Sequence, residues 1–127
     1  MNLITILLVA LGGAIGSIAR YLLAYGAGRL LGSGFPWGTI VINILGSFII
    51  GWFATLSAAD GRAAQPEIIR AFVMAGVCGG FTTFSAFSLQ SFELLRGGEP
   101  ISAIANITGS VALCLVATFF GAWLARG

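Results

Sequence analysis

Long stretches without any charged residue are the feature that most constrains this chain. Its 127 residues include six basic and four acidic side chains, and 30 consecutive uncharged residues separate Arg29 from Asp60. A helix needs about 20 mostly apolar residues to cross the hydrocarbon core of a bilayer. Charged residues make up 8% of the sequence, whereas a soluble domain carries about 25%. The sequence therefore predicts a protein embedded in a lipid bilayer.

Four segments are long enough to span the bilayer, and they predict an all-α membrane protein with a single transmembrane domain over residues 1–127. The approximate helices cover residues 2–31, 36–58, 67–95 and 100–126. The connections between them are short, so we expect any function to lie within the bilayer. We expect a multi-pass protein of the cell membrane, the inner or plasma membrane.

The composition argues against several classes of function. The chain has no histidine, and its two cysteines, Cys78 and Cys114, lie 36 positions apart. Zinc sites and histidine-based acid/base catalysis therefore lack their usual residues. The net charge is +2 and the basic residues are scattered, whereas nucleic-acid binding needs a clustered basic face. We expect neither an enzyme nor a nucleic-acid partner.

The arginines give almost no instruction for orientation in the membrane. Four spans put both termini on one side. That side would carry Arg62, Arg70 and Arg126, and the opposite side would carry Arg20, Arg29 and Arg96. An excess of positive charge normally sets the topology, and here the two sides are equal. Either other features fix the orientation, or the chain inserts both ways and forms an antiparallel pair. We favour the pair, because four helices are too few to enclose a polar pathway.

The third span contains a segment that is poor helix material. Gly79 and Gly80 precede Phe81, Thr82 and Thr83, and this combines two conformationally free residues with two hydroxyls that compete for backbone hydrogen bonds. We expect a break there. Irregular backbone at membrane depth is tolerated where it is buried or lines a cavity, and its freed carbonyls are common ion ligands. An intact helix with a glycine-rich packing face remains the alternative.

Glycines spaced four apart occur in two spans, at Gly12 and Gly16 and at Gly76 and Gly80. Small residues let helix backbones approach closely where lipid supplies no hydrophobic drive for association. We expect these glycines to serve helix packing.

Aromatic and polar side chains inside the spans are the candidate site residues. Phe84 and Phe87 lie three apart on one helix face, and ring edges carry a positive rim that suits a small anion. Simple packing is the alternative for both rings. Asn43 in the second span is either an interhelical contact or a donor to a solute.

The fourth span carries a weakly polar stripe, and no span carries an acidic residue near its middle. Asn106, Ser110 and Cys114 recur at every fourth position of one helix face. Glu93 comes only at the far end of the third span, so a proton-coupled transporter lacks its carboxylate. Passive conduction is favoured. The competing interpretations are a small dual-topology membrane transporter and a non-conducting membrane assembly subunit.

The residues from Gly79 to Ser88 read Gly-Gly-Phe-Thr-Thr-Phe-Ser-Ala-Phe-Ser. They closely resemble the Gly-Gly-x-Thr-Thr-Phe-Ser-Thr-Phe-Ser signature of the Fluc (CrcB) fluoride channels. Trp37-Gly-Thr with Asn43 and Gly46 is similar to that family's second helix, and Gly12-Gly13 with Arg20 is similar to its first. The length and the four-span plan extend the resemblance over the whole chain.

The resemblance implies a fluoride-selective channel that passively exports fluoride from the cytoplasm through an antiparallel, dual-topology homodimer. It implies that the ring edges of Phe84 and Phe87 face the ion, that Asn43 donates to it, and that Ser85 and Ser110 supply hydroxyls. Less certain pore or vestibule positions are Thr83, Asn106, Cys114 and Arg20. The backbone carbonyls of Gly79 and Thr82 match a structural Na⁺ site at the dimer interface.

The sequence also departs from the family pattern. Ala86 replaces a common threonine, Asn106 a common tyrosine, Cys114 a hydroxyl and Gln90 a common glutamate. These changes put the details of the anion track in doubt, and they leave the aromatic pair untouched.

Overall fold

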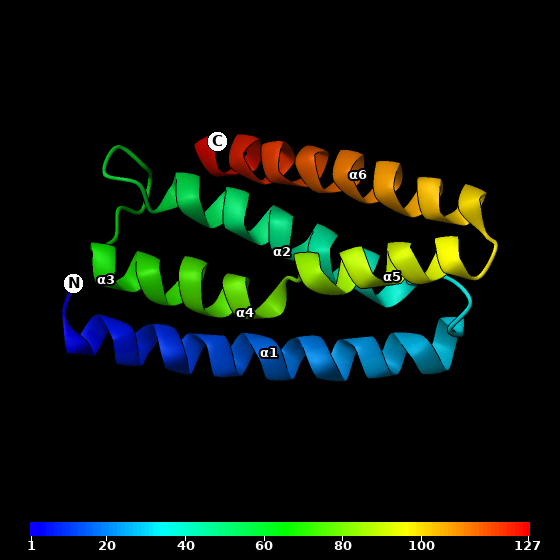
Figure 1. Ribbon diagram of the computed structural model, residues 1–127. Coiled ribbons are helices and arrows are strands. Elements are labelled where there is room, and N and C mark those ends of the chain that lie inside the picture. Colours follow the sequence, from blue (N-terminus) through cyan, green and yellow to red (C-terminus); the bar gives the residue numbers. More distant parts are fainter.

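The computed structural model describes all 127 residues and contains four long helical spans (Figure 1). Three spans are single helices, namely α1 (Leu3–Leu31), α2 (Trp37–Leu56) and α6 (Pro100–Arg126). The third span is divided into α3 (Glu67–Arg70), the π-helix η1 (Ala71–Cys78), α4 (Gly79–Phe81) and α5 (Phe84–Arg96). Each span is long and apolar enough to cross a membrane. The prediction of an all-helical chain with four spans is confirmed.

The helix ends follow local sequence signals. Asn2 begins α1, because its side-chain oxygen accepts a hydrogen bond from the Thr5 amide at 2.8 Å, as N-cap residues do. Gly32 ends α1 with a positive φ of 79°, which glycine adopts without strain. Pro100 occupies the first turn of α6, where its missing N–H costs nothing. These signals account for span ends that lie within two residues of the expected ones.

The third span changes its packing partner halfway along its length. Its first half, η1 and α4, packs against α1, whereas α5 packs against α6. The α2 helix packs along α6 and also contacts α1. Figure 1 shows the four spans side by side with both termini at the same end. The break in the third span therefore lies at the centre of the bundle.

Glycines form the contact between α1 and the first half of the third span. A Cβ added at Gly12 would lie 2.6 Å from the Phe72 carbonyl oxygen, and one at Gly76 would lie 3.1 Å from the Gly12 Cα. A Cβ at Gly80 would lie 3.0 Å from the Gly13 Cα. The two backbones therefore touch directly, and the prediction that the spaced glycines serve helix packing is confirmed.

The break in the third span lies at Thr82 and Thr83. Both residues are extended, with ψ of 158° and 113°, while Gly79 and Gly80 remain helical. Thr82 Oγ1 donates to the Cys78 carbonyl at 2.9 Å, and Thr83 Oγ1 accepts from the Ala86 amide at 3.1 Å. The expectation of a break is confirmed. The threonine hydroxyls end one helix and cap the next, whereas the glycines were wrongly expected to take part in the break.

Most large apolar side chains point outward from the bundle. Only 18 of the 127 residues are buried in the single chain, and the exposed set includes many Leu, Ile and Phe side chains. A soluble monomer rarely leaves so much apolar surface in contact with water. The outer surface of this bundle is therefore suited to lipid or to a second protein surface.

The glycine contact generates a prediction about stability. Gly12→Ala should lower the free energy of unfolding by about 1–3 kcal/mol, because the added methyl group meets the Phe72 carbonyl. Gly13→Ala is the matched control, since a Cβ there meets no atom within 4 Å. Thermal unfolding of the purified protein in detergent would measure both. Equal melting temperatures for the two variants would contradict the packing described here.

Candidate functional site

A partly open cavity of about 300 Å³ lies beside the break in the third span. Its walls come from α2, η1, α4, the broken segment, α5 and α6. The structure brings eight of the eleven predicted site residues together around it: Asn43, Gly79, Thr82, Thr83, Phe84, Phe87, Ser110 and Cys114. Ser85, Asn106 and Arg20 lie outside this lining.

The side chain of Asn43 pairs with the backbone of the break. Its Nδ2 donates to the Thr83 carbonyl at 3.0 Å, and its Oδ1 accepts from the Thr83 amide at 2.8 Å. An unpaired backbone group inside a bilayer costs several kcal/mol. Asn43 therefore bonds both backbone groups of the extended residue Thr83, as a neighbouring β-strand would. An amide nitrogen carries two hydrogens, so one N–H of Asn43 remains for another acceptor.

The break also frees backbone carbonyls at the end of α4. In a continuous helix the Thr83 amide would bond to the Gly79 carbonyl and the Ala86 amide to the Thr82 carbonyl. Here the Thr83 amide donates to Asn43 and the Ala86 amide to the Thr83 hydroxyl. The carbonyls of Gly79 and Thr82 thereby lose their helical donors at the edge of the cavity.

Arg20 caps the same helix end from the opposite side. Its Nε donates to the Gly80 carbonyl at 3.0 Å, and Ser17 Oγ lies 3.5 Å from the same oxygen. Arg20 lies 11 residues before the end of α1, about 16 Å along the helix axis. The expectation that Arg20 lies with Arg29 and Arg96 at one face of the membrane was therefore wrong. A cation near a helix C-terminus complements its partial negative charge.

The two predicted aromatic residues are neighbours with different surroundings. The Phe84 and Phe87 ring centroids lie 5.3 Å apart, and their planes meet at 55°. Such tilted geometry directs the positive edge of one ring toward the face of the other. Phe87 is 9% exposed and Phe84 is 76% exposed. The wall of the cavity at Phe84 is therefore incomplete in a single chain.

The hydroxyl and amide residues of α5 and α6 divide into two groups. Ser85 is exposed, and its Oγ lies 3.3 Å from Thr83 Oγ1. Ser110 faces the cavity, while Asn106 lies behind it, 1% exposed, with Nδ2 donating to Ser91 Oγ at 2.9 Å. Ser110 Oγ in turn donates to Asn106 Oδ1 at 3.2 Å. The polar stripe of the fourth span is thus partly a cavity wall and partly a buried contact between helices.

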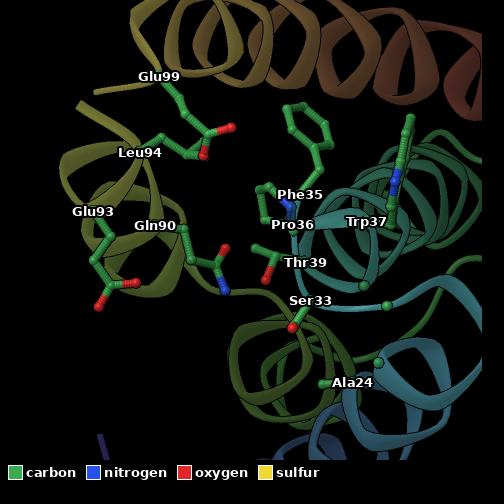
Figure 2. Close-up of a pocket in the computed structure, with 14 residues that line it drawn as sticks. Ala24, Ser33, Phe35, Pro36, Trp37, Thr39, Gln90, Glu93, Leu94 and Glu99 are labelled. Carbon is green, nitrogen blue, oxygen red and sulfur yellow. The ribbon is translucent and has the colours of Figure 1, made fainter. Parts of the chain in front are cut away.

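A second pocket of about 440 Å³ lies at the end of the bundle away from the termini. The lining includes Gln90, Glu93 and Glu99, and Figure 2 shows the Gln90 amide directed toward Thr39. Gln90 Oε1 is buried without a hydrogen-bond partner, so a water molecule is its natural partner. Phe84, Phe87 and Gln90 follow one another at intervals of three along α5. The two pockets therefore lie along the same helix.

Sequence reasoning missed part of the cavity wall. Met74 and Cys78 both line the cavity from η1, and Ser47 and Val111 line it from α2 and α6. No pattern in the sequence indicates a π-helix, whose wider turn sets which residues of η1 share a face. Ser47 lies four residues after Asn43 on α2, so helical spacing from Asn43 was the available signal.

The geometry has the features of a small pathway for an anion. The lining offers amide and hydroxyl groups, the rings of Phe84 and Phe87 and backbone carbonyls, and it contains no carboxylate and no basic side chain. Glu93 and Glu99 line the second pocket, and Asp60 lies in a third pocket with Arg62 and Arg126, so the carboxylates of these pockets lie outside the cavity at the break. The amide and hydroxyl groups of the lining are uncharged donors, which can bind an anion without holding it permanently.

Comparison with known proteins agrees with this geometry. Residues 7–122 match the family model described as CrcB-like protein, Camphor Resistance (CrcB). The chain is 54% identical over 115 residues to the fluoride-specific ion channel FluC of Opitutus terrae, covering 91% of this chain and 87% of that protein. It is 50% identical over 119 residues to the FluC of Paramagnetospirillum magneticum, covering 94% and 93%. With its four apolar spans, the chain is a multi-pass membrane protein that belongs to the CrcB family.

Proposed function

We propose that this protein is a fluoride-specific ion channel that passively exports fluoride from the cytoplasm. Its relatives carry that name at about half identity across nine-tenths of the chain. The observation that supports the proposal best is the uncharged cavity in which Phe84, Phe87 and Asn43 meet a broken helix. Conduction of this kind is transport, so the protein is not an enzyme.

The lining suits fluoride because a small anion must replace its water with other hydrogen-bond donors. The free N–H of Asn43 and the hydroxyls of Thr83 and Ser110 supply such donors in the lining. Ser85 lies outside the lining and adds a hydroxyl 3.3 Å from Thr83 Oγ1. The edges of Phe84 and Phe87 add a weaker positive field. Since no fixed charge lines the cavity, the ion is not trapped, and a narrow passage disfavours chloride. Cys114, four residues after Ser110 on α6, forms part of the same cavity wall.

Arg20 contributes to this pathway through its charge. It lies at the depth of the break and donates to the Gly80 carbonyl, and no acidic side chain pairs with it. An unpaired cation at membrane depth marks an ion pathway by default. Arg20 therefore raises the electrostatic potential for an anion near the break while it also holds the helix end in place.

The functional unit in this proposal is an antiparallel homodimer. Phe84 is largely exposed in the single chain, and polar residues beside it would otherwise contact lipid, which is costly. A second, inverted copy covers the cavity and brings two broken helices together, as inverted repeats do in other transporters. With Arg20 inside the span, Arg62, Arg70 and Arg126 remain near the span ends on the side of the termini, and Arg29 and Arg96 near the span ends on the other side. So small a bias permits both orientations.

A structural Na⁺ at the dimer interface is part of the same proposal. The Gly79 and Thr82 carbonyls have lost their helical donors, and unwound carbonyls at half-helix ends are common Na⁺ ligands. Two such carbonyls from each subunit would hold the ion. A bound cation would supply fixed positive charge close to the anion pathway.

Flux measurements test the proposed function. Liposomes containing the purified protein should lose fluoride and retain chloride when valinomycin carries the potassium counterion, as measured with an ion-selective electrode. Phe84→Ile and Phe87→Ile should each reduce fluoride loss by at least about tenfold, because the aliphatic side chain has no positive edge. Phe119→Ile is the matched control, since Phe119 is exposed on α6 and lines neither pocket. Equal loss of both halides, or unchanged flux in both pore variants, would refute the proposal.

Labelling tests the dual orientation. Ser33→Cys and Ala64→Cys lie at opposite ends of the bundle in exposed loops, and each is made in a background with Cys78→Ala and Cys114→Ala. A membrane-impermeant maleimide applied to spheroplasts should label about half of each variant if both orientations occur. A single orientation would give nearly complete labelling of one variant and none of the other.

Thermal unfolding tests the Na⁺ site. The dimer should melt several degrees higher in sodium chloride than in potassium or choline chloride at equal concentration, because a ligand bound only to the folded state stabilises it. Chloride and ionic strength are held constant, so the cation is the only variable. The same melting temperature in all three salts would remove Na⁺ from the proposal.

A further inference from the structure

A continuous chain of hydrogen bonds joins the backbone carbonyl of Phe87 to the hydroxyl of Ser110. Ser91 Oγ donates to the Phe87 carbonyl at 2.9 Å, and Asn106 Nδ2 donates to Ser91 Oγ at 2.9 Å. Ser110 Oγ then donates to Asn106 Oδ1 at 3.2 Å. Asn106 is 1% exposed and Ser91 is 6% exposed. The chain is therefore buried between α5 and α6, away from water.

The direction of each bond in this chain is fixed. A serine hydroxyl has one proton to donate, and that of Ser91 goes to the Phe87 carbonyl. Ser91 can therefore only accept from Asn106, which places the amide nitrogen toward Ser91 and the amide oxygen toward Ser110. The single proton of Ser110 consequently points at Asn106. The cavity side of Ser110 presents lone pairs, which repel an anion.

We propose that Asn106 is a positioning residue that controls permeation through Ser110, and not a group that contacts the ion. Asn106 accepts the hydrogen bond of Ser110 and so keeps this hydroxyl hydrogen directed away from the cavity. When fluoride arrives, the hydroxyl rotates and donates to the ion instead. The inference rests on the proposed function, because it needs an anion in this cavity. It gives Asn106 a role that its burial permits, whereas direct contact with the ion would require exposure to the cavity.

The bond that must be exchanged is a weak one. At 3.2 Å the Ser110–Asn106 distance exceeds the 2.7–2.8 Å that is typical of hydroxyl donors. Fluoride is a strong acceptor and can receive the hydrogen bond of Ser110 when the hydroxyl rotates about its Cβ–Oγ bond, while the proton stays on Oγ. Asn106 competes for the same proton, so it shortens the time that the ion stays bound. A conduction site must release its ion as readily as it accepts it.

A double-mutant cycle separates this role from simple packing. Asn106→Leu removes the competing acceptor at similar side-chain volume, and Ser110→Ala removes the hydroxyl donor. The half-saturating fluoride concentration and the maximal flux are measured for the wild type, both single variants and the double variant. Asn106→Leu alone should lower the half-saturating concentration about threefold to tenfold, because one hydrogen bond no longer competes. It should also lower the maximal flux, since the ion leaves more slowly.

The Ser110→Ala background decides the matter. If Asn106 acts through Ser110, Asn106→Leu changes neither quantity there. Equal shifts in both backgrounds, or no shift in either, would overturn the inference. Thr108→Val is the control for loss of a hydroxyl on α6, because Thr108 is exposed and bonds only to Ile104 of its own helix. If the leucine variant does not assemble, Asn106→Ala removes the same acceptor and completes the cycle.

The same experiment distinguishes this inference from the proposed function. A wild-type protein without fluoride-selective flux would refute both. A wild type that conducts fluoride, with no coupling between positions 106 and 110, would refute only the role of Asn106.

Discussion

The pairing of Asn43 with the backbone of Thr83 is the interaction on which the rest of the site depends. A bilayer offers no water to an extended residue, so its amide and carbonyl must find partners within the protein. One side chain supplies both, at 2.8 and 3.0 Å. With these groups satisfied, the third span can stop and restart at membrane depth. The restart turns α5 toward α6, which sets the aromatic pair beside the cavity.

Much of the fold could be predicted from the sequence because the constraint is simple. Bilayer thickness fixes the length of a span, so the spacing of ten charges located four helices. The spaced glycines predicted close helix packing, because small residues let backbones approach, and the structure shows that the contact joins α1 to the third span. The π-helical turn and the exact place of the break were beyond this reasoning. They depend on Thr82 Oγ1, Thr83 Oγ1 and Asn43 acting together, and that needs three-dimensional neighbours.

The sequence predicted which residues line the site better than it predicted what each of them contacts. Residue type made candidates of Phe84 and Phe87 beside the break and of Asn43 in the second span, and the family resemblance assigned them to the pore. All three line one cavity. The sequence left open whether Asn43 contacts another helix or donates to an ion. In the structure its side chain bonds to Thr83 of the third span and keeps one N–H for a further acceptor. For Asn106 and Arg20, spacing along the sequence could not reveal which face of each helix packs against another helix. Asn106 bonds within the bundle and Arg20 reaches across to Gly80.

The change of partner along the third span has a consequence for biogenesis. Helices emerge from the ribosome in order, so α1, α2 and the first half of the third span can pack together before synthesis ends. The α5 segment packs mainly on α6, which is made last. The cavity wall at Ser110 and the hydrogen bond from Asn106 to Ser91 therefore form only when the final helix leaves the translocon. A nascent chain stalled before that point holds an unfinished pore.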